Sequence, residues 1–215
     1  MRIGIIGTGT VGATLGKRWA ATGHEVMFGA REPGSAKVTS LVATAGVKTR
    51  AGSVAEAARF GEVVVLATPF DATEAAIRQA GDLAGRVVID CTNPLKPDLS
   101  GLSVGHATSG AEAVARWAKG ARVVKTLNST GAGNMANPVY GGERATMFVC
   151  GDDAVAKTTA GELVSALGFD VVDAGPLAQA RTLEPLAMLW ISLALQSGLG
   201  PNIAFRLMRR GVVDK

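Results

Sequence analysis

The strongest constraint on the fold is an alternation of short apolar runs with longer helical patterns through the first 127 residues. The run at 63–67, Val-Val-Val-Leu-Ala, is apolar at every position, as expected of a strand covered on both faces. Further strands are predicted at 2–6, 25–29, 47–49, 87–90 and 122–125. Strands that alternate with helices in this way predict an α/β fold, a Rossmann-type doubly wound parallel sheet with right-handed crossovers.

The pattern changes after residue 127, so we predict a domain over 1–127 and a smaller C-terminal α/β region over 128–215 that ends in helices. Residues 131–142 are rich in Gly, Asn and Pro and predict a loop with at most one helical turn. Beyond it we expect a strand at 146–150, a helix capped by Asp152 or Asp153 that runs to 167, a strand at 171–173, and helix thereafter, broken by Gly198, Gly200 and Pro201. No low-complexity linker separates the two regions, so they should pack closely.

Composition excludes several classes of function. The chain is 47% hydrophobic and 19% charged, which is typical of a globular protein. Cys91, Cys150, His24 and His106 show no metal-ligand spacing, so no metal site is expected. The net charge is +4, but Lys and Arg are scattered and there is one Tyr, which argues against nucleic-acid binding. The longest apolar stretch, 183–195, is too short to cross a membrane. Isolated thiols without a recognisable leader predict a cytoplasmic protein.

A phosphate-binding turn is predicted at Gly7-Thr8-Gly9-Thr10-Val11-Gly12, which matches G-x-G-x-x-G. With 28 glycines in 215 residues this spacing arises by chance about 0.5 times per chain, so the motif alone is weak. Its position after an N-terminal strand and at the start of a helix makes it specific. Gly7 permits the tight turn, Gly9 the close approach of a pyrophosphate, and Gly12 the packing of helix on strand. A purely structural glycine turn is the alternative.

A second match, Gly131 to Ala136 in the G/A form of the motif, follows the strand at 122–125. Asn137-Pro138 comes immediately after it, so a long helix cannot form there. This segment therefore predicts a ligand-facing loop and no second dinucleotide site.

The end of the second strand distinguishes NADP from NAD. NAD enzymes usually have an acidic residue there for the ribose hydroxyls, whereas this chain has Ala30 and Arg31. The guanidinium of Arg31 suits a 2′-phosphate, and Ser35 and Lys37 can add to the same pocket. Glu32 is a partial objection, and a solvated arginine is the alternative. We favour NADP.

The predicted carboxyl ends of the later strands carry few groups capable of acid–base chemistry. They read Thr68-Pro69-Phe70, Cys91-Thr92-Asn93-Pro94 and Thr126-Leu127-Asn128-Ser129-Thr130. Tyr140 is followed four residues later by Arg144, so a Tyr-x-x-x-Lys pair is absent. This pattern favours direct hydride transfer between two stacked planar cofactors, with no catalytic side chain and with the protein supplying orientation.

The chain resembles the NADPH-dependent reductases of the 8-hydroxy-5-deazaflavin coenzyme F420. The motifs that carry the resemblance are the glycine turn and the segments 28–31 (Phe-Gly-Ala-Arg), 149–153 (Val-Cys-Gly-Asp-Asp), 173–177 (Asp-Ala-Gly-Pro-Leu) and 203–207 (Ile-Ala-Phe-Arg-Leu). They cover nearly the whole chain and keep their order. The resemblance implies an NADP-binding Rossmann domain over 1–127 and an acceptor-binding, dimerising region over 128–215.

The same resemblance implies the site residues. It implies that the pyrophosphate is held by Thr8, Gly9, Thr10 and Val11, and the 2′-phosphate by Ala30, Arg31 and Ser35. It implies that the nicotinamide is flanked by Phe70, Asn93 and Ala132, and that the deazaflavin lies against Thr68, Pro69, Asn128, Met135 and the C-terminal region. The archaeal members have Ser in place of Ala30 and His in place of Asn128.

The function expected from these observations is hydride transfer between NADP(H) and coenzyme F420. The alternatives are an NADPH-dependent reductase of another acceptor (a flavin, an imine or a keto acid) and a non-catalytic NADP-sensing module. The helix at 185–195, which contains Trp190, is apolar nearly all round, so it should be buried on all sides. Either the core or a second subunit would cover it, and by resemblance the chain forms a homodimer.

Overall fold

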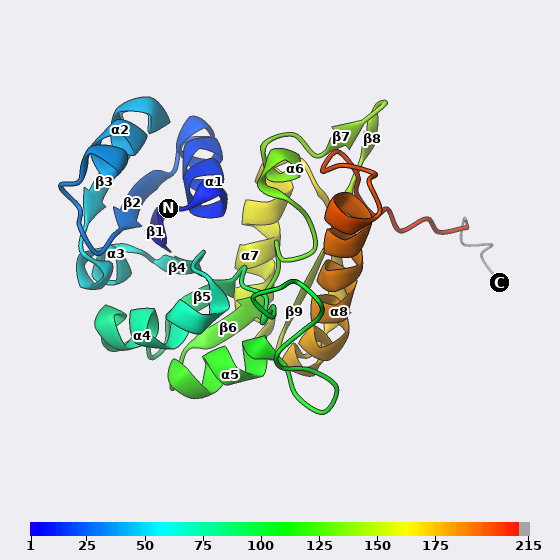
Figure 1. Cartoon of the computed structure of the whole chain (residues 1–215). Helices are drawn as coiled ribbons and strands as arrows, with labels where there is room; N and C mark the ends of the chain where they lie inside the picture. Colours follow the sequence, from blue (N-terminus) through cyan, green and yellow to red (C-terminus); the bar gives the residue numbers. More distant parts are fainter. Residues whose placement is uncertain (211–215) are drawn as a thin grey trace.

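The computed structural model describes residues 1–210, which build one continuous eight-stranded sheet with helices on both faces (Figure 1). The strand order is β3-β2-β1-β4-β5-β6-β9-β10. The strands are β1 (Arg2–Ile6), β2 (Glu25–Gly29), β3 (Thr49–Gly52), β4 (Val63–Leu66), β5 (Val87–Asp90), β6 (Arg122–Lys125), β9 (Thr146–Gly151) and β10 (Asp170–Gly175). A separate two-stranded hairpin joins β7 (Val139–Tyr140) to β8 (Glu143–Arg144).

The order of the first six strands, 3-2-1-4-5-6, is that of a Rossmann fold, which confirms the predicted fold class. All neighbours among these six strands are parallel, as are β9 and β10. The exception is β9, which runs antiparallel to β6, so the sheet is mostly parallel instead of wholly parallel. Because β9 and β10 extend the same sheet, the two halves of the chain share a continuous hydrogen-bonded layer.

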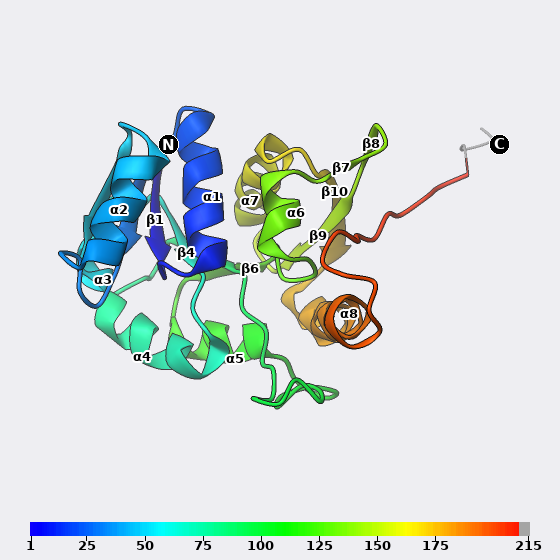
Figure 2. The same ribbon diagram turned by 45° about the horizontal axis from the view of Figure 1, so that its top comes forward.

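The helices lie on the two sides of the sheet (Figure 2), and each side has its own buried apolar cluster. They are α1 (Thr10–Ala21), α2 (Ala36–Ala45), α3 (Val54–Phe60), α4 (Phe70–Ala80), α5 (Gly110–Trp117), α6 (Ala132–Ala136), α7 (Ala154–Ala166) and α8 (Ala180–Ile191). One buried cluster joins the sheet to α1, α2 and α7, and within it the indole N–H of Trp19 donates to the carbonyl of Leu163 at 2.9 Å. The other joins the opposite face to α3, α4, α5 and the start of α8. Burial of both sheet faces explains the continuous apolar strands.

The start of α7 shows how local sequence defines an element boundary. The Asp153 carboxylate accepts a hydrogen bond from the backbone N–H of Ala156 at 2.7 Å, which satisfies one of the unpaired donors at the helix start. Of the two aspartates predicted as the cap, Asp153 is therefore the residue that caps α7. Asp152 instead accepts from the backbone of Leu177 at 2.9 Å, ahead of α8.

The third strand lies later in the chain than predicted. The expectation of a strand at 47–49 is wrong, because Val47 is fully exposed in a turn that begins at Gly46, where φ is +106°. β3 begins at Thr49, where it pairs with Val26 of β2. Pairing with β2 starts only at the carbonyl of Lys48, which accepts from the backbone N–H of Val26 at 3.0 Å, so Val47 lies before the strand.

The end of the described chain is not helical, so the expectation of helix after Pro201 is wrong. α8 passes into a short π-helical segment, Ser192–Gln196, and residues 201–210 adopt no regular structure. The backbone carbonyls of this last segment find other partners: Asn134 and Trp190 both donate to the carbonyl of Ile203, at 2.8 and 2.7 Å. Side chains thus satisfy the backbone groups that a helix would have paired internally.

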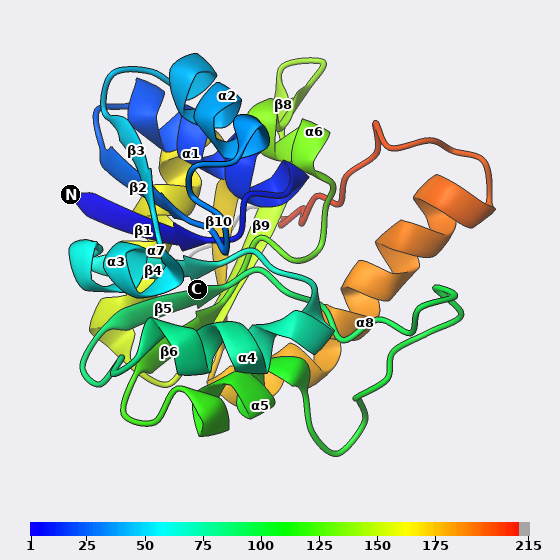
Figure 3. The same cartoon turned by 60° about the vertical axis from the view of Figure 1, so that its left-hand side comes forward.

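The segment 185–195 is also less buried than predicted. Leu189 and Leu195 are 49% and 60% exposed, so the expectation of burial on all sides is wrong for the single chain. Figure 3 shows the end of α8 and the loop that follows β5 projecting together from the sheet, and Gln196 donates to the carbonyl of Leu99 at 3.1 Å. One face of α8 packs on the core, and the other faces outward.

Candidate dinucleotide and acceptor site

The glycine turn has the geometry that its sequence predicts. Gly7 has φ of +118°, and a Cβ added there would lie 2.4 Å from the carbonyl oxygen of Ala67. A Cβ on Gly12 would lie 2.1 Å from the carbonyl oxygen of Gly7. Both glycines are therefore required by the protein itself. Gly9 differs, because no heavy atom lies within 4 Å of its added Cβ; the space on that side is open, as the close approach of a pyrophosphate requires.

The start of α1 offers free backbone donors to an anion. Gly9 precedes the helix with no side-chain cap, and the first turn contains no acidic residue. The unpaired N–H groups and the helix dipole favour negative charge at this point. A nucleotide pyrophosphate is a suitable ligand, so the residues present fit the predicted group.

A cavity of about 460 Å³ lies where the strand order reverses, between the carboxyl ends of β1 and β4. This is the position at which open α/β sheets bind their ligands, and the volume suits a small-molecule site. The predicted residues that line it are Gly7, Thr8, Gly9, Ala30, Arg31, Thr68 and Pro69. Sequence reasoning missed the wall that α4 contributes, which consists of Ala72, Ala75, Ala76 and Gln79. The i, i+3, i+4, i+7 spacing of these residues places them on one face of α4, and three of the four are alanines. This pattern is the signal that could have revealed the wall.

A second hollow of about 340 Å³ adjoins the first and carries positive charge. It shares Thr8, Ala30, Arg31 and Lys37 with the larger cavity and adds Glu32, Ser35 and Val38. Within residues 1–210 neither Arg31 nor Lys37 forms an ion pair. The Ser35 side chain makes no capping bond to α2. Two cations and a hydroxyl therefore face this hollow beside the one carboxylate of Glu32, so its charged side chains favour an anionic group.

The residues predicted to flank the nicotinamide do not line these two hollows. Phe70 begins α4, and its ring lies 5.5 Å from that of Trp117. Asn93 follows β5, and its amide donates to the backbone carbonyl of Asn128 at 2.8 Å. Ala132 begins α6, which packs on α1. The structure thus joins Asn93 to Asn128 directly but places Ala132 on a separate element.

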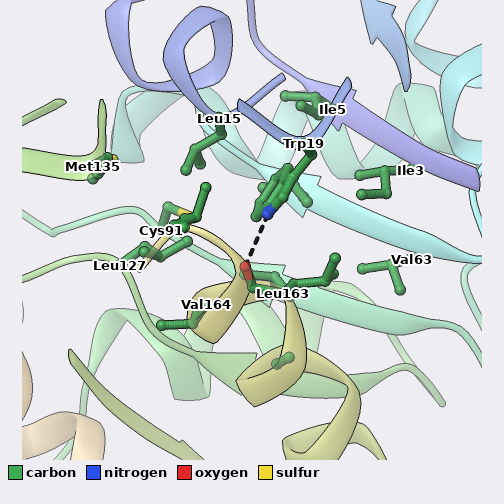
Figure 4. Close-up of a cluster of buried hydrophobic side chains, with 14 of the residues drawn as sticks. Ile3, Ile5, Leu15, Trp19, Val63, Cys91, Leu127, Met135, Leu163 and Val164 are labelled. Atoms are coloured by element: carbon green, nitrogen blue, oxygen red, sulfur yellow. Dashed lines mark hydrogen bonds between the residues drawn. The ribbon is translucent and has the colours of Figure 1, made fainter. Parts of the chain in front are cut away.

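Both predicted acceptor residues, Asn128 and Met135, are largely enclosed by protein. The Asn128 amide donates to Asn93 Oδ1 at 3.1 Å and to the carbonyl of Leu183 in α8 at 3.0 Å. Met135 is 1% exposed, and Figure 4 places it in the same apolar cluster as Leu127. Any contribution of Met135 to an acceptor pocket in this conformation is therefore through packing.

The cysteines near the sheet are poor nucleophiles. Cys91 directly follows β5 and is buried, and burial raises the pKa of its thiol far above the ordinary value. Burial likewise raises the pKa of Cys150 in β9 to about 12. Both thiols stay protonated near neutral pH, and a thiol is far less nucleophilic than a thiolate.

Sequence reasoning missed a buried charge network of Asp90, Lys125 and Glu184, each at most 1% exposed. Lys125 Nζ lies 3.0 Å from Asp90 Oδ2 and 3.1 Å from Glu184 Oε1. Burial by itself lowers the pKa of Lys125, but the two carboxylates outweigh burial and the pKa is raised. The lysine is therefore charged. The sequence signal that could have revealed the network is the position of Asp90 and Lys125, two opposite charges at the last positions of two otherwise apolar strands.

Strand order, switch-point cavity and phosphate turn together define a Rossmann-type dinucleotide-binding protein. Residues 2–94 match the family model described as NADP oxidoreductase, coenzyme F420-dependent. The F420-dependent NADP reductase of Methanothermobacter marburgensis is 30% identical over 92% of this chain and 94% of its own length. The chain belongs to the family of coenzyme F420-dependent NADP oxidoreductases.

The share of the matched protein that this chain covers differs among the other similar proteins. The solved structure of a putative F420-dependent NADP reductase from Arthrobacter sp. FB24 has a TM-score of 0.88 and 35% identity, covering 97% of this chain and all of that one. Rat metalloreductase STEAP3 is 31% identical over 87% of this chain, but the chain spans only 37% of its length. An imine reductase from Bacillus cereus, at 20% identity and a TM-score of 0.64, shares the fold.

In the part of the chain that the structure describes, no helix is both long and apolar enough to span a membrane.

Proposed function

We propose that this protein transfers a hydride between NADP(H) and coenzyme F420, as family membership implies. The observation that carries the proposal is the continuity of the two hollows. The cavity at the glycine turn and the hollow that contains Ser35 and Glu32 share Thr8, Ala30, Arg31 and Lys37, so Arg31 and Lys37 line both. A dinucleotide with a 2′-phosphate fits this arrangement, because its pyrophosphate and 2′-phosphate are held at two neighbouring positions.

Within this proposal the residues act by binding and orientation. Gly7 and Gly12 shape the turn, and Thr8, Gly9, Thr10 and Val11 present backbone donors to the pyrophosphate. Ala30, Arg31 and Ser35 hold the 2′-phosphate, with Lys37 beside them. Phe70, Asn93 and Ala132 flank the nicotinamide. Thr68 and Pro69, which line the cavity, face the deazaflavin together with Asn128 and Met135.

The chemistry of the transfer belongs to the two cofactors, since a nicotinamide and a deazaflavin exchange a hydride directly when stacked. The protein therefore needs no proton donor at the carbon that reacts. Asn93 and Asn128 carry neutral amides, and the Cys91 thiol is held protonated by burial. Exclusion of water and alignment of the rings are the contributions that such side chains can make.

The experiment is an anaerobic assay of purified protein with NADP and reduced F420, followed by the absorbance of NADPH. We expect turnover with NADP and much slower turnover with NAD. No oxidation of the deazaflavin at saturating NADP contradicts the proposal. Parallel reactions with NADPH and a free flavin, an imine, a keto acid or a ferric chelate test other acceptors; the last is included because STEAP3 is a metalloreductase. Binding of NADPH without turnover in any arm identifies an NADP sensor.

We also propose that the protein is a cytoplasmic homodimer that binds no nucleic acid. The two unpaired thiols suit a reducing compartment. Leu189, Leu195 and Leu199 are exposed on and after α8, at 49%, 60% and 60%. Exposed leucines gathered along one stretch of chain are typical of a surface that a second copy covers.

A further inference from the structure

The Asp90–Lys125–Glu184 network has every polar atom satisfied. The Lys125 ammonium donates to Asp90 and to the backbone carbonyl of Thr92, and it forms an ion pair with Glu184 at 3.1 Å, so it has three partners for its three protons. Asp90 Oδ1 accepts from the backbone N–H and the hydroxyl of Thr92, at 2.9 and 2.7 Å. The carboxylate of Glu184 accepts from the first two backbone N–H groups of α5, at 2.8 and 3.0 Å.

Such a network is an inefficient way to stabilise a fold. Removing two carboxylates and an ammonium from water is costly, and well-packed apolar residues in their place are often as stable or more stable. A role in geometry is therefore the better explanation of why this chain keeps three charges in its interior. The location supports that explanation, because Asp90 and Lys125 are paired last residues of β5 and β6, at the ligand-binding edge of the sheet.

The network leads directly to the two asparagines predicted at the hydride-transfer site. Lys125 holds the carbonyl of Thr92, and the next residue is Asn93, which exchanges hydrogen bonds with Asn128. On the other side, Glu184 of α8 is preceded by Leu183, whose carbonyl accepts from Asn128 at 3.0 Å. Two consecutive residues of α8 therefore link the two groups: Leu183 binds the amide pair, and Glu184 belongs to the charge network.

The backbone between Lys125 and Asn128 is itself constrained. Leu127 has φ of +57°, a left-handed conformation that leucine rarely adopts, and it is 1% exposed. Such a conformation persists only where the surrounding contacts impose it. Lys125 before it and the Asn128 bonds after it are contacts of this kind, so the turn at the end of β6 is held from both sides.

We propose that Lys125 is a positioning residue for hydride transfer: held by Asp90 and Glu184, it fixes Thr92 and thereby orients the Asn93–Asn128 pair against the bound rings. The inference rests on the proposed function, which places Asn93 beside the nicotinamide and Asn128 toward the acceptor. Without the ammonium, the carbonyl of Thr92 loses its partner and the amide pair can shift. A displacement of about 1 Å in a site that aligns two reacting rings costs about a hundredfold in rate.

The test uses the charge-matched variant Lys125→Met/Asp90→Asn. It removes one positive and one negative charge, so the net charge of the network stays at −1, and Glu184 keeps its two donors from α5. We expect kcat for hydride transfer to fall about 10- to 100-fold, while the Kd for NADP stays within about twofold of wild type, because the phosphate contacts are untouched. Leu163→Ala, a core truncation in α7, is the control, with lower stability but wild-type kcat.

A second measurement is independent of turnover. In ¹⁵N-labelled protein with NADP bound, the side-chain amide resonances of Asn93 and Asn128 should shift in the double variant and stay unchanged in Leu163→Ala. Where the double variant does not fold, Glu184→Gln, which keeps the Lys125–Asp90 pair, should move both readouts in the same direction. Wild-type kcat or unshifted amide resonances in the folded variant overturn the inference. Wild type that reduces no acceptor contradicts the proposed function instead, and the amide resonances still decide the role of Lys125.

Discussion

At the scale of single residues, Arg31 is expected to determine the choice between NADP and NAD. Replacement by Ala should weaken NADPH binding by about 1.5–3 kcal/mol, the contribution of a hydrogen bond to a charged group. NADH binding should hardly change, because NADH lacks the 2′-phosphate. Titration of both nucleotides into wild type and Arg31→Ala measures this. Arg59→Ala, on α3 away from the hollow, is the control, and unchanged NADPH affinity in Arg31→Ala refutes the assignment.

The glycines of the turn should separate binding from folding. Gly9→Ala places a methyl group in space free of protein atoms, so stability should fall by less than about 1 kcal/mol. NADP affinity should fall at least about tenfold, since the methyl group occupies the path of the pyrophosphate. Gly7→Ala should instead destabilise the fold by about 1–3 kcal/mol through backbone strain, and further through overlap with Ala67.

Thermal unfolding and NADP titration of both variants test this distinction. Equal losses of stability in Gly7→Ala and Gly9→Ala contradict it, because only the first glycine has a protein atom against its missing side chain.

At the scale of elements, the contact between α5 and α8 should depend on pH. The Arg181 guanidinium donates to both oxygens of Glu112, at 2.9 and 2.6 Å, and with Ser109 it lowers the pKa of Glu112 from 4.5 to about 2. Because the folded-state pKa is lowered, this stabilisation is complete above about pH 4.5 and is lost as the pH falls through about 2.

Glu112→Gln should therefore be less stable than wild type at pH 5–7 but approach it toward pH 2. Urea unfolding across this range measures the difference in the free energy of unfolding. Glu74→Gln removes an exposed carboxylate that pairs within α4 and serves as the control. A difference for Glu112→Gln that stays constant down to pH 2 rules out this linkage.

At the scale of the whole molecule, the outward side of α8 and of the π-helical segment that follows it should form the contact between two copies. Sedimentation should give twice the monomer mass of 21.9 kDa. Leu195→Glu places a charge on the exposed apolar face and should yield monomers, because burying an unpaired carboxylate is costly. Val47→Glu is the control: it changes an exposed residue in a turn distant in sequence from Leu195, and it should leave the dimer intact. Monomeric wild type at micromolar concentration argues against this proposal.

The sequence was sufficient wherever a feature depends on neighbours in the chain. β1, the glycine turn and α1 form one local unit, and both the spacing of its glycines and the free end of α1 follow from residues 2–21. Arg31 is proposed as a cofactor contact from the sequence because it lies two residues beyond the end of β2. Apolar runs indicated the central strands because strands covered on both faces need no polar alternation.

Tertiary structure decided what depends on residues far apart in the chain. Nothing local in β9 specifies its antiparallel pairing with β6, and nothing local in residues 201–210 indicates that Asn134 and Trp190 satisfy their carbonyls. In the sequence, Lys125 is only the polar end of a predicted strand. The fold brings Glu184 to it. The physical reason is that chain neighbours determine local conformation, whereas partners for buried charges and free backbone groups exist only once distant elements pack.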